Sequence, residues 1–433
     1  MRCICVILDG LGDRGHAAFR GRTPLQVAHT PYLDKLAALG MNGLYHSFFQ
    51  GIAMSSEMAH FRMFGYDVHD FPGRGLLEAV GEGIPVKNGE VALLARLVSV
   101  DEEERTLVLR QENPEVDAHT CHVLQEEIER YEKDGVEVHF VPTKGIKGIL
   151  VMRGHVSSQI TDSNPIYEGR PLMEVLPLHG QRKDTGAHLT ARILNEYLIW
   201  CYRTLSEHPL NAERVKEGVP ALNAVGTQRA GQMRHLPSFE EKWGLRALSI
   251  ASGPVYVGLG TLLGMNCHGA TDSEEPGKDL LDRLRAAKEM EDFDFVHVHT
   301  KAVDEASHAK DPDVKRTVIE SLDPAFAFAL DEIVPDKEVL LVITSDHSTP
   351  STGKMIHSGE TVPLTILGKY TRRDGVTGFD EIRCAGGSLG VVRGNELMYL
   401  ILNFLDRGKL FGLMDSPIDR PYMAADSKPL KVK

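Results

Sequence analysis

The sequence predicts an α/β protein, with a mostly parallel sheet flanked by helices and a small α+β domain inserted into it. Two observations support this prediction. Short, continuously apolar runs alternate with amphipathic helical stretches along the 433 residues, as expected for a parallel sheet covered on both faces. Residues 88–178 have a different pattern from the rest of the chain, with a charged run and short predicted strands in which apolar and polar residues alternate. We therefore expect a core from residues 1–87 and 179–433, and an inserted α+β lid domain at 88–178.

The expected elements follow from local patterns. Residues 3–8 are continuously apolar, as a buried strand would be. Residues 30–40 open with a candidate N-cap threonine and a proline at the first helical position, and close on glycine, which predicts a helix. A long helix is expected at 186–205. The remaining expectations are core strands at 293–299, 338–344 and 363–367, and, in the insertion, a helix at 119–133 with strands at 136–141 and 148–152.

Composition excludes several classes of function. The chain has 48 Lys and Arg against 61 Asp and Glu, for a net charge of −13, so a nucleic-acid backbone would repel it. No apolar run reaches the length of a membrane span. The six cysteines form no C-x-x-C pair, which predicts free thiols and a cytoplasmic protein. Cys3 and Cys5 share one side of a strand, and we interpret them as buried apolar residues. The polar tail, 426–433, is expected to fray.

Metal-ligand residue types follow the predicted strands, where open α/β sheets place their sites. Asp9 comes directly after the first strand and suits a metal ligand or a helix cap equally. Asp304 and His308 are spaced to share one helical face, which suits one ion, although surface salt links have the same spacing. Asp346 and His347 follow another strand, where the two side chains can diverge to serve two adjacent ions.

Two further residues complete the inventory. His357 lies in an irregular, glycine-containing stretch typical of a binding loop. Ser56 precedes a predicted helix that ends near Gly65; it could be a cap only, or a nucleophile if a metal lowers its pKa and free helix amides bind phosphoryl oxygens. Together these residues supply the oxygen and nitrogen ligands and the hydroxyl that two-metal phosphoryl transfer requires. Three histidines favour Zn²⁺ or Mn²⁺ over Mg²⁺ as the pair of divalent ions, although Mg²⁺ stays open.

The motifs resemble those of a known family. The resemblance runs nearly end to end and is carried by residues 9–14 (DGLGDR), 23–25 (TPL), 30–34 (TPYLD), 65–67 (GYD), 73–75 (GRG), 78–84 (EAVGEGI), 194–196 (LNE), 236–239 (LPSF), 269–271 (GAT), 301–305 (KAVDE) and 344–350 (TSDHSTP). These segments are similar to the archaeal-type cofactor-independent phosphoglycerate mutases of the alkaline phosphatase superfamily. The resemblance implies an alkaline-phosphatase-like core and an enzyme that needs no 2,3-bisphosphoglycerate.

The resemblance also implies residue roles. Ser56 would be the phosphorylated nucleophile. One ion would be held by Asp304, His308 and His357, and the other by Asp9, Ser56, Asp346 and His347. The phosphoryl group would pass from 3-phosphoglycerate to Ser56 and return to the 2-hydroxyl of the retained glycerate. The expected partner is therefore a small phosphorylated metabolite.

Lys and Arg residues are expected to hold the substrate carboxylate and phosphate. Lys301, beside a metal loop, is the first candidate for a phosphate contact and Arg393 the second; either could instead be a solvated surface charge. Arg229, Asp162 and Arg153 are the remaining candidates for substrate contacts.

Three motifs depart from the family pattern. The nucleophile segment reads Ser-Ser-Glu-Met-Ala-His at 55–60, where the archaeal-type family has Gly-Ser-Asp-Thr-Ala-His. Residues 227–231 (TQRAG) displace an expected arginine by one position to Arg229, and 162–165 (DSNP) lose one carboxylate. Because the metal ligands are intact and the substrate surround differs, a phosphatase or phosphotransferase acting on another phosphorylated metabolite is the alternative. A metal-binding protein without catalysis is disfavoured, since the nucleophile and every ligand are present.

Overall fold

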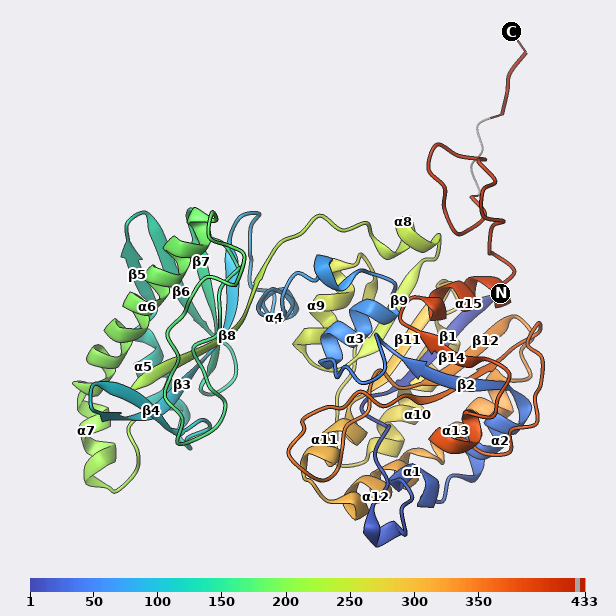
Figure 1. The fold of residues 1–433 in the computed structure, drawn as a ribbon, viewed down its shortest axis with the longest axis horizontal. Helices are drawn as coiled ribbons and strands as arrows, with labels where there is room; N and C mark the ends of the chain where they lie inside the picture. The colour runs from blue at the N-terminus through green and yellow to red at the C-terminus, as the bar shows by residue number, and fades with distance from the viewer. Residues whose placement is uncertain (425–428, 433) are drawn as a thin grey trace. The chain divides into compact units, whose positions relative to one another are not determined.

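The computed structural model describes residues 1–424 and 429–432, so the prediction about the polar tail falls partly on residues outside these ranges. The chain divides into two compact units. The first contains residues 1–71 and 236–433, and the second contains residues 72–235. The chain thus leaves the first unit once and returns to it, and each unit has its own sheet (Figure 1).

The first unit is built on an eight-stranded sheet with the order β10-β9-β11-β1-β12-β13-β2-β14. Its central strands pair in parallel, and β13 alone runs against its neighbours β12 and β2. The strands are β1 (Arg2–Leu8), β2 (Met41–His46), β9 (Ala247–Ala251), β10 (Asn266–Gly269), β11 (Phe295–Thr300), β12 (Val339–Thr344), β13 (Val362–Leu367) and β14 (Gly390–Arg393). The predicted strands at 3–8, 293–299, 338–344 and 363–367 are confirmed as β1, β11, β12 and β13.

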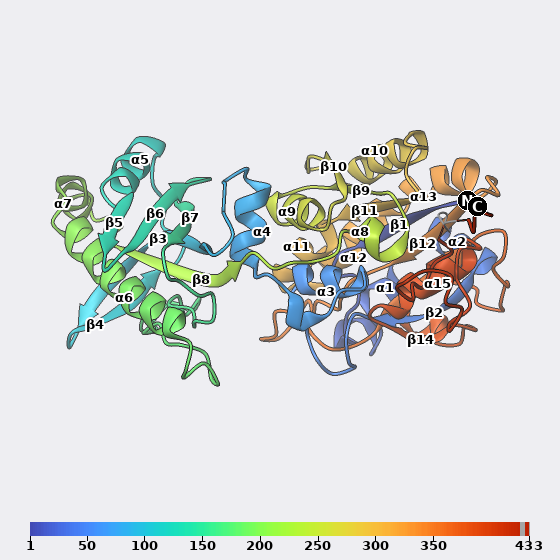
Figure 2. The same cartoon turned by 90° about the horizontal axis from the view of Figure 1, so that it is seen from above.

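Helices cover both faces of this sheet, with α10 and α13 on one side and α3 and α15 on the other (Figure 2). They are α1 (Pro24–Val27), α2 (Pro31–Leu39), α3 (Ser56–Met63), α8 (Phe239–Trp243), α9 (Pro254–Leu262), α10 (Pro276–Glu289), α11 (Ala302–His308), α12 (Pro312–Leu322), α13 (Ala325–Phe328), α14 (Glu381–Cys384) and α15 (Glu396–Phe404), with short turns at Ala17–Phe19, Val68–Asp70 and Ala329–Ile333. The predicted α/β fold is therefore confirmed.

Alternation along β1 divides the core of the first unit between the two faces. Ile4, Val6 and Leu8 belong to one apolar cluster with residues of α2, α10, α12 and α13. Cys3 and Cys5 point the other way, and both are buried with free thiols, as their interpretation as apolar core residues requires. Because both faces of β1 are dry, its run of seven residues is apolar almost throughout.

The N-terminus of α2 shows how tertiary structure replaces a local signal. Thr30 occupies the cap position, as predicted, but its side chain makes no capping hydrogen bond. The carboxylate of Asp323 instead accepts hydrogen bonds from the amides of Tyr32 and Leu33 at 3.1 and 2.9 Å. A side chain almost 300 positions away thus satisfies amides that a local cap would have satisfied.

The second unit has an antiparallel sheet with the order β4-β3-β7-β6-β5, and β8 pairs with β3. Its strands are β3 (Val91–Glu103), β4 (Thr106–Gln111), β5 (Arg130–Lys133), β6 (Val136–Pro142), β7 (Lys147–Arg153) and β8 (Ala224–Gln232), and its helices are α4 (Arg74–Gly81), α5 (Ala118–Glu126), α6 (Thr185–Ser206) and α7 (Pro209–Lys216). α6 runs along one face of this sheet, and its buried residues share a core with those of α5 (Figure 1). α4 packs against the other face.

In this region two predictions are corrected and one is confirmed. The helix expected at 119–133 ends at Glu126, because residues 130–133 form β5 by pairing with β6. The long helix expected at 186–205 is present as α6. The unit is also wider than the expected insertion of 88–178, because β8 pairs along β3 and α4 and α6 pack on the same sheet. None of the helices within the described ranges is long and apolar enough to cross a membrane.

Candidate active site

Every candidate catalytic or metal-binding residue of the first unit follows a strand of the parallel sheet or lies in a loop beside it. Since parallel strands end at one edge, their C-terminal ends bring distant parts of the sequence together. Asp9 follows β1, Ser56 begins α3 after β2, Asp304 and His308 lie in α11 after β11, and Asp346, His347 and His357 follow β12.

Gly10 allows two of these segments to approach each other closely. It has φ +68°, a conformation that favours glycine. A Cβ at this position would lie 2.8 Å from Asp304 Cβ and 2.7 Å from Thr349 Oγ1. The absence of a side chain at Gly10 therefore lets Asp9 and Asp304 belong to one site.

The first ligand cluster joins Asp9, Asp346 and His347, whose candidate ligand atoms all lie within 4.8 Å of one another. His347 Nε2 lies 3.3 Å from Asp9 Oδ1 and 3.2 Å from Asp346 Oδ2, and the Ser56 hydroxyl lies 2.9 Å from the same nitrogen. The position after β12 would allow Asp346 and His347 to diverge, but the two side chains meet in this cluster. Both lie beyond the end of β12 at Thr344, where the loop backbone lets the two side chains converge.

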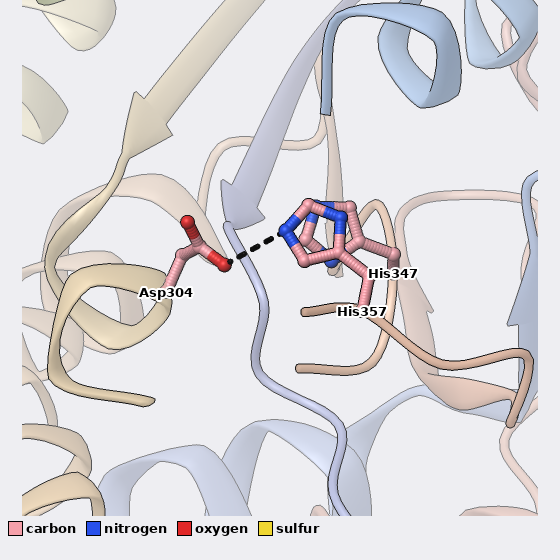
Figure 3. Close-up of side chains that lie close together, drawn as sticks. All are labelled: Asp304, His347 and His357. Atoms are coloured by element: carbon pink, nitrogen blue, oxygen red, sulfur yellow. Dashed lines mark ion pairs between the residues drawn. The ribbon is translucent and has the colours of Figure 1, made fainter. Parts of the chain in front are cut away.

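The second cluster joins Asp304, His347 and His357, whose ligand atoms also lie within 4.8 Å of one another (Figure 3). Asp304 presents Oδ1 to His357 Nε2 at 3.5 Å and Oδ2 to His308 Nε2 at 3.2 Å. The His347 and His357 rings stack with centroids 3.8 Å apart. His347 thus stands between the two clusters, and His308, whose side chain is 39% exposed, stands at the outer side of Asp304.

In Asp9 and Asp346, one carboxylate oxygen accepts hydrogen bonds from the described residues and the other accepts none from them; we call the second oxygen bare. The Tyr256 hydroxyl donates to Asp9 Oδ2 at 2.8 Å, and His299 Nε2 lies 3.1 Å from the same oxygen. Two backbone amides donate to Asp346 Oδ1 at 3.2 and 3.0 Å. Within the described part of the chain, Asp9 Oδ1 and Asp346 Oδ2 are buried and accept no hydrogen bond. Both bare oxygens lie near His347 Nε2, and Asp346 Oδ2 also lies 3.4 Å from Nδ1 of the buried His60.

The electrostatics of this arrangement fit divalent cations. Burial, followed by the carboxylates of Asp346 and Asp304, raises the pKa of Asp9 well above its usual value, and Lys301 opposes this only in part. Burial lowers the pKa of His347 to about 4, so its ring is neutral near pH 7 and keeps a lone pair for a ligand. Three buried carboxylates and the imidazole nitrogens beside them form a donor set that suits Mn²⁺ or Zn²⁺.

The candidate substrate residues lie in both units. In the first unit, Lys301 is half-buried at the start of α11, and Arg393 is exposed at the end of β14. In the second unit, Asp162 Oδ1 accepts a hydrogen bond from the Arg229 amide at 2.6 Å, which joins two motifs that depart from the family pattern. Arg153 lies elsewhere in that unit, and its guanidinium pairs with Glu90 at 3.2 Å.

The residues around the clusters that were not singled out from the sequence include Tyr256, His299 and Thr349. The Thr349 hydroxyl donates to Asp304 Oδ1 at 2.8 Å and lies 3.1 Å from His347 Nδ1, so it links the two clusters. His299 and Thr349 stand in segments that the sequence did mark, the strand 293–299 and the motif 344–350. Tyr256 follows β9 in α9, and its only signal is a polar group placed after a parallel strand.

A family model and a relative with similarity to this chain carry the same description. A family model described as 2,3-bisphosphoglycerate-independent phosphoglycerate mutase matches residues 37–211. The protein named 2,3-bisphosphoglycerate-independent phosphoglycerate mutase 2 of Methanocaldococcus jannaschii is 39% identical, and the alignment covers 99% of each chain.

Two solved structures resemble this one over most of its length. A protein from Pyrococcus horikoshii has a TM-score of 0.75 at 26% identity, with 95% of this chain and 99% of that chain covered. The cofactor-independent phosphoglycerate mutase from Thermoplasma acidophilum has a TM-score of 0.63 at 28% identity, with 93% and 99% covered. The similarity therefore extends across both units.

Proposed function

The chain belongs to the family of 2,3-bisphosphoglycerate-independent phosphoglycerate mutases, and from this premise we propose that it interconverts 3-phosphoglycerate and 2-phosphoglycerate through phosphorylated Ser56. One observation carries the proposal. The Ser56 hydroxyl stands at the first turn of α3, 2.9 Å from His347 and beside the bare oxygens of Asp9 and Asp346. A hydroxyl in this position is a nucleophile candidate rather than a helix cap, since Ser55 occupies the cap position.

The proposed centre takes two divalent ions, Mn²⁺ or Zn²⁺. Asp304, His308 and His357 would hold one ion, and Asp9, Ser56, Asp346 and His347 the other. When bound, such ions lower the pKa of a serine hydroxyl and stabilise the charge on a transferred phosphoryl group. The bare oxygens of Asp9 and Asp346 support this ligand set.

The chain's own chemistry is then symmetrical. Ser56 Oγ forms a bond to phosphorus while the bond to the 3-oxygen of phosphoglycerate breaks. Ser56 loses a proton and the glycerate gains one. The 2-hydroxyl of the retained glycerate then attacks phosphorus and loses its proton. The bond from the 2-oxygen to phosphorus forms as the bond from phosphorus to Ser56 Oγ breaks, and Ser56 regains a proton. No 2,3-bisphosphoglycerate enters this sequence.

Substrate contacts by Lys301, Arg393, Arg229, Asp162 and Arg153 stay predictions, as do the lid role expected for residues 88–178 and the cytoplasmic location. Each contact can be tested by single substitution. A lost contact to the substrate carboxylate or phosphate raises KM without changing metal content.

The testing experiment measures mutase activity of Mn²⁺-supplemented protein on 3-phosphoglycerate, with enolase consuming the product and no 2,3-bisphosphoglycerate added. We expect turnover that chelation abolishes. Ser56→Ala should abolish this turnover while the metal content stays unchanged. The matched control is Ser55→Ala, since Ser55 is adjacent and its side chain makes no capping hydrogen bond. This variant should keep near wild-type activity.

The outcomes separate the alternatives. Activity in Ser56→Ala, or its loss in Ser55→Ala alone, would contradict the assigned nucleophile. If 3-phosphoglycerate is not converted but a chromogenic phosphate monoester is cleaved in a Ser56-dependent reaction, the enzyme acts as a phosphatase or phosphotransferase on another metabolite.

A further inference from the structure

Lys315 is a fully buried cation directly behind the candidate active site. It lies in α12 on the same face as Ile319 and Leu322, and its side chain has no exposed surface. Its ammonium donates to the carbonyl oxygens of Gly10 at 3.0 Å, Gly12 at 2.7 Å and Thr349 at 2.8 Å. Asp13 Oδ2 lies 3.2 Å away as its counter-charge.

These acceptors belong to the segments that carry the candidate ligands. Gly10 and Gly12 follow Asp9 in the loop after β1, and Thr349 lies two residues after His347 in the loop after β12. Lys315 itself stands in the helix that follows α11, which carries Asp304 and His308. One ammonium therefore joins three segments that carry candidate ligands, and the first and last of these lie more than 300 positions apart in the sequence.

The loops that Lys315 joins also contact each other directly: the Gly10 amide donates to Asp346 Oδ1 at 3.2 Å, and the Ser351 hydroxyl donates to Asp13 Oδ2 at 2.7 Å. The Thr349 amide donates to the Gly12 carbonyl at 3.0 Å, and the Leu11 amide donates to Ser345 Oγ at 3.0 Å. Without the ammonium, the carbonyls of Gly10, Gly12 and Thr349 would each lose a hydrogen bond. Gly12 would keep the Thr349 amide and Asp13 would keep its donors from Ser351, but a buried carbonyl that loses its donor is costly. The loops would therefore move to reach water or other donors, and the spacing between Asp9 and His347 would change with them.

Burying an ammonium costs several kcal/mol before its partners are counted, so packing alone does not explain a lysine on the apolar face of α12. We infer that Lys315 is a positioning residue for the metal centre, fixing the loop of Asp9 and the loop of Asp346 and His347 at the separation that their shared ion requires. This inference rests on the proposed function for the presence of the ions. Lys315 touches no candidate ligand atom, and it acts through the backbone.

The chain offers a matched control at the opposite end of β1. Arg2 is also a buried cation that donates to three carbonyls, those of Ala287, Lys288 and Met290 at 2.9, 2.7 and 3.0 Å. It stands seven positions before Asp9 on the other edge of the sheet. Arg2→Met therefore removes a comparable set of buried interactions without touching the ligand loops.

The experiment compares Lys315→Met and Arg2→Met in the full chain after chelator treatment. Urea unfolding of the metal-free proteins should show a loss of stability in both variants. Isothermal titration with Mn²⁺ should show binding weakened about tenfold or more in Lys315→Met and unchanged in Arg2→Met. The visible absorption spectrum of the Co²⁺-loaded protein should shift only in Lys315→Met, because it reports ligand geometry and not global stability.

Wild-type Mn²⁺ affinity and an unshifted Co²⁺ spectrum in Lys315→Met would overturn the inference. If Lys315→Met does not fold, Lys315→Arg keeps the charge but replaces a tetrahedral ammonium with a planar fork, and the same two measurements decide. Failure of the proposed function is distinguishable, since wild-type protein that binds Mn²⁺ but does not convert 3-phosphoglycerate leaves the Lys315 comparison intact.

Discussion

Replacing Gly10 with alanine should destabilise the first unit and disturb the metal centre together. The left-handed backbone at φ +68° costs an alanine about 1–2 kcal/mol. The added Cβ would also lie 2.7 Å from Thr349 Oγ1 and 2.8 and 2.9 Å from the Cβ and Cα of Asp304. Overpacking of this kind costs about 1–3 kcal/mol, so Gly10→Ala should lose about 2–5 kcal/mol in all.

Gly21→Ala separates the two contributions. Gly21 has φ +83°, and a Cβ there meets nothing within 4 Å, so only the backbone cost of about 1–2 kcal/mol remains. Urea unfolding can be followed by the fluorescence of Trp243, which is buried in the first unit, in a Trp200→Phe background that removes the other tryptophan. Titration with Mn²⁺ then measures the second effect.

We expect Gly10→Ala to lose more stability than Gly21→Ala and to bind Mn²⁺ more weakly, because Asp304 must move away from Asp9. Equal losses of stability, with equal Mn²⁺ affinity, would refute this reasoning. Such a result would mean that α11 can withdraw without cost, and that close approach at Gly10 does not hold the two clusters together.

Three further predictions concern the site and its surroundings. Asp304→Asn or His308→Ala should lower bound metal by about one ion per chain in elemental analysis, and unchanged occupancy in both would contradict the ligand assignment. Tyr256→Phe should weaken Mn²⁺ binding about tenfold, because Asp9 Oδ2 loses the hydrogen bond that orients it. An Mn²⁺ affinity equal to that of the wild type in a titration would contradict this. Burial raises the pKa of Glu381 to about 7, so its stabilising effect is full below the ordinary value of 4.5 and is lost as the pH rises through about 7. The free energy of unfolding of the metal-free wild type, measured in urea, should therefore fall by about 3 kcal/mol between these pH values, and that of Glu381→Gln should not. The same fall in both proteins would contradict the raised pKa of Glu381.

Local pattern predicted much of the fold. The run at 3–8 and the period of the residues in α6 depend on neighbours within one element, so β1 and α6 could be predicted from them. The predicted helix at 119–133 was wrong beyond Glu126, because residues 130–133 become a strand only by pairing with β6. The width of the second unit also escaped prediction, since β8 joins β3 from more than 100 positions away.

The sequence by itself determined which residue types stand after the strands of the parallel sheet, because a metal-ligand motif and the strand before it are continuous in the chain. Asp9, Asp304 and Asp346 could be named for that reason. Only the tertiary structure decided which atoms meet: that His347 faces both Asp9 and Asp346, that Tyr256 and His299 hold one oxygen of Asp9, and that Lys315 joins the loops. These contacts join segments up to 340 positions apart, and no local periodicity encodes a partner at that distance. They depend on where the parallel strands of an eight-stranded sheet end at one edge, which is fixed when the whole sheet forms.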